Sequence, residues 1–167
     1  MTIETLFGKE ETASKPRSIK FRQIKAVYET LTVREDIVRL LENWIEIHLS
    51  SQVSDTFQFL MKETKEIFIT LHLDGKNRII CMDVVSIGSL NQSIVHMRSV
   101  FMTACLSSAA AIICVHNHPS GDPTPSSEDI AITKRLSEAG ELMGIRLLDH
   151  IIVGDGTYLS FTERGLL

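Results

Sequence analysis

The feature that most constrains the fold is a short apolar run at residues 111–115, Ala-Ile-Ile-Cys-Val. A run this brief and this uniformly apolar predicts a strand that is buried on both faces of a sheet. Helical patterns at residues 97–110 and 127–142 flank it on either side. Helices and strands therefore mix along this chain without a strict βαβ repeat, which predicts an α/β (α+β) fold.

The remaining pattern alternates between helical and strand periodicity. Thr32-Val33-Arg34-Glu35 fits a capping box, and apolar residues at helical spacing follow it to about residue 48. Further elements are expected as a helix at 53–62, strands at 67–73 and 78–85 joined by a turn at 74–77, and strands at 145–153 and 157–161. We expect three parts: a partly mobile N-terminal arm at residues 1–30, a helical extension at 31–50 and a main domain at 51–167.

Composition indicates a reduced globular protein. The chain has 167 residues, of which 44% are hydrophobic, enough to bury the core of one ordinary domain. Its three cysteines form no C-x-x-C pair and stand in apolar stretches, which argues against a disulfide framework. The N-terminus lacks a signal-peptide pattern, and no apolar run approaches the roughly 20 residues that span a membrane. We expect a cytoplasmic location.

A basic stretch near the N-terminus bears on possible partners. It holds five cations with no acid among them: Lys15, Arg17, Lys20, Arg22 and Lys25. The net charge of −4 gives no reason to expect avid nucleic-acid binding by the whole surface. We interpret the stretch as a solvated strand edge, and a phosphate-binding arm that contacts nucleic acid is the alternative.

The chemistry begins with His116 and His118, at the end of the buried strand. Residues two apart in an extended segment point to the same side, so both imidazoles can reach one ion. Three of the four prolines of the chain lie in the loop that follows, and a stiff loop holds side chains in fixed positions. An H-x-H pair alone is weak evidence, because loop histidines are commonly solvated or hydrogen-bonded.

Ser126 and Asp129 stand at the entrance of the next expected helix. A carboxylate there would complete a set of two histidines and one acid, which binds Zn²⁺ and leaves a fourth position for water. Ser-x-x-Asp is also a helix-capping pattern, and taken alone capping is the better interpretation. The histidine pair just upstream shifts the balance toward a metal ligand.

The spacing His-x-His-x7-Ser-x-x-Asp over residues 116–129 resembles that of the JAMM (MPN) metallopeptidases. The longer string at 116–129, and Leu-Asp-His-Ile-Ile-Val-Gly at 148–154, resemble the RadC branch of that superfamily. The resemblance covers residues 50–167. It implies a JAMM/MPN-like, cytidine-deaminase-like fold, in which a mixed, curved sheet is flanked by helices.

The resemblance also implies a mechanism. His116, His118 and Asp129 would hold zinc, which lowers the pKa of a bound water to about 7. Glu66, at the start of the expected strand at 67–73, stands where the superfamily has a glutamate that passes the proton of the water to the leaving amine. Ser126 would donate a hydrogen bond to the oxyanion. Glu63, three residues earlier, is the competing glutamate.

Some positions depart from the RadC pattern or stay open. Val-His-Met-Arg-Ser at residues 95–99 replaces the Val-His-Pro-Arg-Glu that is common in RadC relatives. Nothing before residue 50 shows the Gly-rich hairpin of a helix-hairpin-helix DNA-binding region, so we expect a short form. Asp149 and His150 are open between a role in orienting a ligand imidazole and a purely local pairing, which we slightly prefer. We expect Asp122, which precedes a proline, to form a turn.

Three functions compete at this stage. The leading one is a zinc hydrolase of peptide or isopeptide bonds. The second is a metal-dependent nuclease or a DNA-repair or DNA-processing factor. The third is a binding module that keeps the fold, with or without the metal, and does not catalyse a reaction. A zinc deaminase is disfavoured because the sequence lacks Pro-Cys-x-x-Cys.

Overall fold

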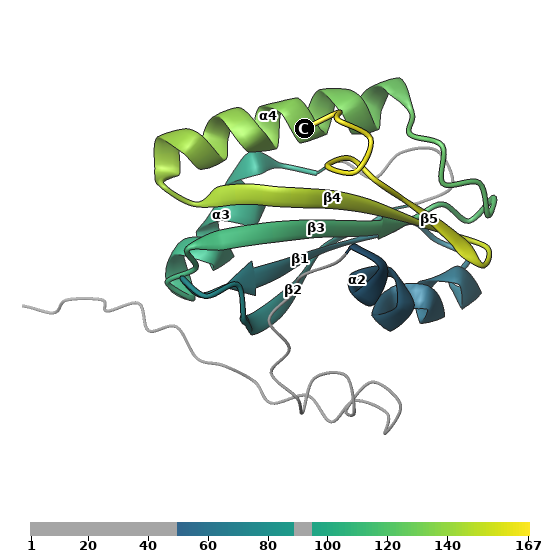
Figure 1. Ribbon diagram of the computed structural model, residues 1–167, viewed down its shortest axis with the longest axis horizontal. Helices are drawn as coiled ribbons and strands as arrows, with labels where there is room; N and C mark the ends of the chain where they lie inside the picture. Colours follow the sequence, from purple (N-terminus) through teal and green to yellow (C-terminus); the bar gives the residue numbers. More distant parts are fainter. Residues whose placement is uncertain (1–49, 89–94) are drawn as a thin grey trace, which may run out of the picture.

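The computed structural model describes residues 50–88 and 95–167 (Figure 1). Five strands form one mixed, curved sheet in the order β2-β1-β3-β4-β5, so β3 is the central strand. The strands are β1 (Ile67–Leu73), β2 (Ile79–Ile87), β3 (Ala111–Asn117), β4 (Arg146–Gly154) and β5 (Thr157–Ser160). The helices are α2 (Ser50–Phe57), η2 (Gln58–Lys62), α3 (Met97–Leu106) and α4 (Ser127–Met143). The α/β prediction is confirmed.

Helices cover both faces of the sheet, as the apolar run in β3 requires. Alternate residues of β3 supply one core with α2 and η2, and another with α3 and α4 (Figure 1). Every residue of β3 is buried, including the polar His116 and Asn117. Helix α4 connects β3 to β4, and these two strands run parallel. The end of β3 and the start of α4 are therefore brought together in the middle of the fold.

The expected elements agree with the structure in kind and nearly in extent. The helix expected at 97–110 ends at Leu106. Beyond it, Ala109 N–H donates back to Ala104 O, and Ala110 N–H donates to the oxygen of Leu73, the last residue of β1. The expected helix at 53–62 is an α-helix that continues as a 3₁₀ turn. The arm at 1–30, the five basic residues and the helical extension at 31–50, apart from Ser50, lie outside the described residues, so those interpretations stay predictions.

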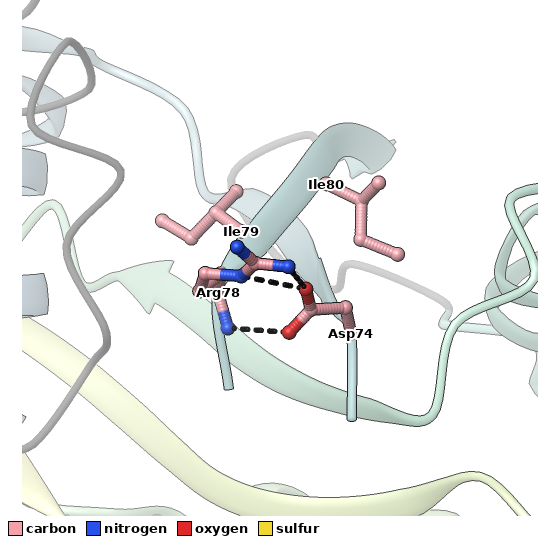
Figure 2. A pocket seen from close by; sticks show the side chains of 4 residues that line it. All are labelled: Asp74, Arg78, Ile79 and Ile80. Atoms are coloured by element: carbon pink, nitrogen blue, oxygen red, sulfur yellow. Dashed lines mark hydrogen bonds and ion pairs between the residues drawn. The ribbon is translucent and has the colours of Figure 1, made fainter. Parts of the chain in front are cut away.

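An open hollow lies beside the β1–β2 turn (Figure 2). It is lined by Asp74, Arg78, Ile79 and Ile80. Asp74 pairs with Arg78 across the turn, with Arg78 Nε donating at 2.7 Å. Leu73 pairs with Ala111 at the start of β3, so this hollow lies at the opposite end of the sheet from His116. None of the helices in the described part of the chain is long and apolar enough to cross a bilayer.

Candidate metal centre

The end of β3 aims two imidazoles in one direction. His116 is fully buried within β3, and His118 follows immediately after the strand. Asn117, between them, points to the other side, as alternation along an extended chain requires. The Nε2 atoms of the two histidines lie 3.1 Å apart. The predicted convergence of the pair is therefore present.

The loop after His118 is docked against the β4–β5 turn. His118 N–H donates to Val153 O at 3.3 Å, and Asp155 N–H donates to Gly121 O at 2.9 Å. Gly154 allows this close approach, because a Cβ there would lie 2.6 Å from Gly121 O and 2.7 Å from Pro123 Cδ. Asp122 forms the expected turn by accepting from the N–H and hydroxyl of Thr124.

Helix α4 brings the carboxylate to the histidines and is capped by the same residues. Ser126 Oγ accepts from Asp129 N–H at 3.1 Å, while Asp129 Oδ2 accepts from Ser126 N–H at 2.8 Å, which completes a capping box. Ser126 Oγ–H also donates to Asp129 Oδ2 at 2.6 Å. Ser126 and Asp129 therefore cap the helix, as the alternative interpretation expected. The same hydrogen bonds orient the Asp129 carboxylate toward the histidines, so capping and metal-ligand geometry occur together.

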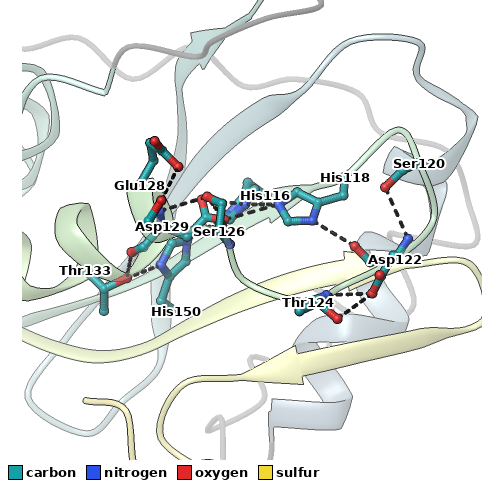
Figure 3. Close-up of polar contacts among 11 residues, drawn as sticks. His116, His118, Ser120, Asp122, Thr124, Ser126, Glu128, Asp129, Thr133 and His150 are labelled. Atoms are coloured by element: carbon teal, nitrogen blue, oxygen red, sulfur yellow. Dashed lines mark hydrogen bonds and ion pairs between the residues drawn. The ribbon is translucent and has the colours of Figure 1, made fainter.

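Three potential ligands converge at this point (Figure 3). Asp129 Oδ1 lies 3.2 Å from His116 Nε2, and Oδ2 lies 3.4 Å from His118 Nε2. Tetrahedral zinc with bonds of about 2.05 Å has ligand atoms about 3.3 Å apart. These three side chains, which we call the metal group, form the one His/Cys/Asp/Glu group suited to a metal ion within residues 50–88 and 95–167. The donor set and its spacing fit zinc, but they do not identify the metal.

Charge interactions within the group are strong. Burial would raise the pKa of Asp129, but hydrogen bonds from His116 and His118 outweigh it and hold that pKa well below its ordinary value. The hydrogen bond to Asp129 raises the pKa of His118 despite partial burial, and the charge of Glu66 adds to this effect. The carboxylate is therefore ionised and ready to bind a cation.

Comparison with known proteins places this geometry in a family. A model of the RadC-like JAB domain matches residues 47–166. The chain belongs to the RadC-like JAB domain family. Relatives include UPF0758 proteins of Pelobacter propionicus, 63% identical over 130 residues, and of Trichlorobacter lovleyi, 56% identical over 149 residues. Another, from Methanosarcina mazei, is 48% identical over 154 residues.

The match covers only part of each relative. This RadC-like JAB domain aligns over 77%, 89% and 89% of its own length, but over 57%, 64% and 64% of those three proteins. The chain thus spans about three-fifths of the curated relatives that it matches. The JAB superfamily assignment is consistent with a metal-binding hydrolase, while the names of the relatives carry no activity.

Glu66 directly precedes β1 in this RadC-like JAB domain, and its charge acts on His118 of the metal group. Its side chain is half-buried, whereas Glu63 is exposed at the end of η2. Asn117 holds the backbone on both sides of Glu66: its Oδ1 accepts from Ile67 N–H at 2.8 Å and its Nδ2 donates to Lys65 O at 3.1 Å. Glu66 is thus anchored to the segment that carries the histidines, and its catalytic role remains a prediction.

The neighbouring pair Asp149 and His150 divides between the two faces of β4. Asp149 accepts from Ser50 Oγ, Ser160 Oγ and Thr162 N–H, so it joins α2 to the C-terminal segment. His150 turns the other way, and its Nε2 lies 2.8 Å from His116 Nδ1. Asp149 therefore makes structural contacts with its neighbours, as we slightly preferred for this pair. His150 instead contacts a candidate ligand imidazole.

Two residues of the RadC-like JAB site gave no signal in the sequence. Thr133 lies one helical turn after Asp129, and its Oγ1 is 2.6 Å from His150 Nδ1 (Figure 3). Asn117 was merely the middle residue of the H-x-H pair. The spacing of Thr133 from Asp129 could have suggested a shared helix face, but nothing local indicated that β4 would place His150 beside it.

Proposed function

We propose that this chain is a zinc-dependent hydrolase of amide or isopeptide bonds in a peptide or protein substrate. The observation that carries the proposal is the convergence of two imidazole nitrogens and one carboxylate at separations of 3.1, 3.2 and 3.4 Å. Two histidines and one acid are a donor set of catalytic zinc sites, which keep a further position for water or substrate. Bound zinc would supply a Lewis acid and an acidified water.

His116, His118 and Asp129 are the residues that would hold the ion. His118 Nδ1–H donates to Asp122 O at 2.8 Å, because a carbonyl oxygen only accepts. This bond directs Nε2 toward Asp129 and His116, and when the ring is neutral this nitrogen offers its lone pair to a cation. Asp129 is aimed by the capping box, so none of the three side chains needs to be reoriented to bind a cation.

Glu66 is proposed to accept the proton of the attacking water and to deliver it to the leaving amine. Its support is its half-buried place at the start of β1 and its electrostatic effect on His118. Ser126 is proposed to donate to the oxyanion of the substrate. Its hydroxyl proton now bonds Asp129 Oδ2, so this role requires the O–H to rotate toward the substrate.

The direct test combines metal binding with cleavage. The full chain is loaded with zinc, freed of excess metal, and assayed on a peptide library and on a lysine isopeptide panel. We expect about one zinc per chain and cleavage of members of at least one panel. His118→Ala should lose both properties, whereas Glu66→Gln should keep zinc and lose cleavage by about 100-fold or more.

Glu63→Gln is the matched control, because it makes the same chemical change three residues away on an exposed side chain. It should cleave like the unmodified chain. Equal loss in Glu63→Gln and Glu66→Gln would remove the case for Glu66, and absence of stoichiometric zinc from the unmodified chain would refute the proposed function.

A further inference from the structure

We propose that Thr133 and His150 are positioning residues that set the tautomer of His116, so that the Nε2 lone pair of His116 is free for a metal. This inference rests on the proposed zinc site. It concerns the hydrogen bonds of the chain itself and extends from helix α4 through strand β4 to strand β3 (Figure 3).

The positions of the protons along this chain of hydrogen bonds can be worked out starting from Thr133. Its Oγ1 lies 2.6 Å from the main-chain oxygen of Asp129 and 2.6 Å from His150 Nδ1. A carbonyl oxygen has no proton to give, so the single hydroxyl proton of Thr133 must lie on the bond to Asp129 O. The contact with His150 then needs a proton from the other side, and His150 Nδ1 must supply it.

The same logic continues to His116. A neutral imidazole that carries its proton on Nδ1 presents an unprotonated Nε2. His150 Nε2 lies 2.8 Å from His116 Nδ1, so it accepts, and His116 Nδ1 must carry the donated proton. His116 Nε2 is the atom that faces Asp129 and His118, and it presents a lone pair to a bound cation once the proton that it shares with Asp129 is displaced.

Burial requires that these groups satisfy their hydrogen bonds with one another, and so requires this arrangement of protons. His116 and His150 are 0% exposed and Thr133 is 1% exposed, so solvent water is poorly placed to replace a missing partner. Phe161 stacks on the His150 ring with centroids 4.9 Å apart, and Phe68 stacks on the His116 ring at 5.7 Å. The rings have little freedom to turn away from each other.

His150 is not itself placed to be a fourth ligand. Its Nε2 faces Nδ1 of His116, on the opposite side of the ring from the Nε2 that joins the metal group. Its Nδ1 is engaged by Thr133. His150 therefore acts through His116, in the way that the main-chain oxygen of Asp122 acts on His118.

The test uses the full chain and two variants of one residue. Thr133→Val keeps the shape of the side chain but removes the acceptor for His150 Nδ1–H, and Thr133→Ser restores the hydroxyl. Zinc affinity is measured by competition with a chromophoric chelator. Two-bond proton–nitrogen NMR spectra of the histidine rings report which nitrogen of His150 carries the proton.

We expect the Nδ1–H tautomer of His150 in the unmodified chain, with and without zinc. Zinc affinity should fall about 10- to 100-fold in Thr133→Val and return to within about threefold of the original in Thr133→Ser. A purely structural role would predict lower stability in Thr133→Val with unchanged zinc affinity, and that result would overturn the proposal.

The unmodified chain gives an independent answer if Thr133→Val does not fold. An Nε2–H tautomer of His150 in a zinc-binding chain would refute the positioning role and leave the proposed hydrolase intact. The Nδ1–H tautomers of His150 and His116 in a chain that fails to bind zinc would support the hydrogen-bond order and refute the zinc hydrolase.

Discussion

Asn117 Oδ1 accepts a hydrogen bond from Ile67 N–H at 2.8 Å and so joins the end of β3 to the start of β1. These two strands are antiparallel neighbours, and Phe68 pairs with His116 in their register. The Asn117 amide extends that pairing by one side-chain link beyond the regular ladder. Its neighbours His116 and His118 belong to the metal group. One tripeptide therefore carries two candidate ligands and also anchors the backbone on both sides of Glu66, the candidate proton carrier.

Replacement of Asn117 by Ala should separate metal binding from catalysis. The change leaves Ile67 N–H and Lys65 O without their partner, so we expect a loss of about 1–3 kcal/mol in the free energy of unfolding. Zinc affinity should stay within about threefold because the ligands are untouched, while cleavage should fall at least about tenfold. Urea unfolding measures the stability, chelator competition measures the zinc affinity, and peptide cleavage measures the activity. Unchanged cleavage in a destabilised variant would contradict the link to Glu66.

Gly154→Ala should move the loop that follows His118. The added Cβ would meet Gly121 O and Pro123 at under 3.0 Å, and backbone cannot yield there without shifting the loop that follows His118. We expect a loss of about 1–3 kcal/mol in unfolding free energy and weaker zinc binding. Gly75→Ala is the matched control, since nothing lies within 4 Å of a Cβ at that position. Equal zinc affinity in the two variants would count against this account.

Ser126→Ala should weaken both the helix and the ligand. It removes the N-cap of α4 and one of the hydrogen bonds that orient Asp129, so we expect about 0.5–2 kcal/mol lower stability together with reduced zinc affinity. Ser127→Ala changes the adjacent hydroxyl, which bonds only the exposed Glu128 carboxylate among the described contacts, and should stay within about 0.5 kcal/mol. Thermal unfolding with and without zinc measures both. A Ser127→Ala effect as large as that of Ser126→Ala would contradict the prediction.

The β1–β2 turn should give a pH-dependent contribution to stability. The hydrogen bond from the Arg78 side chain, with further bonds from the Arg78 and Lys76 backbone, lowers the pKa of Asp74 to about 2. A depressed carboxyl pKa stabilises the folded chain above its unfolded value of 3.8, and this stabilisation disappears as pH falls through about 2. Asp74→Asn should therefore be less stable than the original at pH 6, with the difference shrinking toward pH 2. Urea midpoints across this range test the sign, and a difference that grows on acidification would contradict it.

The free thiols should differ sharply in reactivity. Cys105 is exposed, whereas Cys114 is 0% exposed in β3 and burial raises its pKa. An aromatic disulfide reagent should label Cys105 in the folded chain and reach Cys114 only on unfolding. Cys105→Ser should abolish the fast labelling phase. Rapid labelling of Cys114 under native conditions would show that β3 is not buried on both faces as described.

Local sequence was sufficient for most elements and for the identity of the candidate ligands. The strand at 111–115, the loop with three prolines and the helix that begins at Ser127 follow from periodicity, turn chemistry and capping, which act over a few residues. His116, His118 and Asp129 could be grouped because only thirteen positions separate the first from the last, within one strand–loop–helix unit. The RadC resemblance, confirmed by the family match, added Glu66 from a distant segment.

Tertiary structure alone decided which side chains support those ligands. Cys114 pairs with His150 in the parallel register of β3 and β4, and this register places His150 on the face that His116 shares. Strand register between distant segments depends on packing across the whole sheet, so no local period encodes it. The same is true of Asn117, which meets Lys65 and Ile67 from fifty residues away. The sequence therefore determined which residues can act as metal ligands. Long-range packing decided the direction in which their side chains point and which ring nitrogens carry protons.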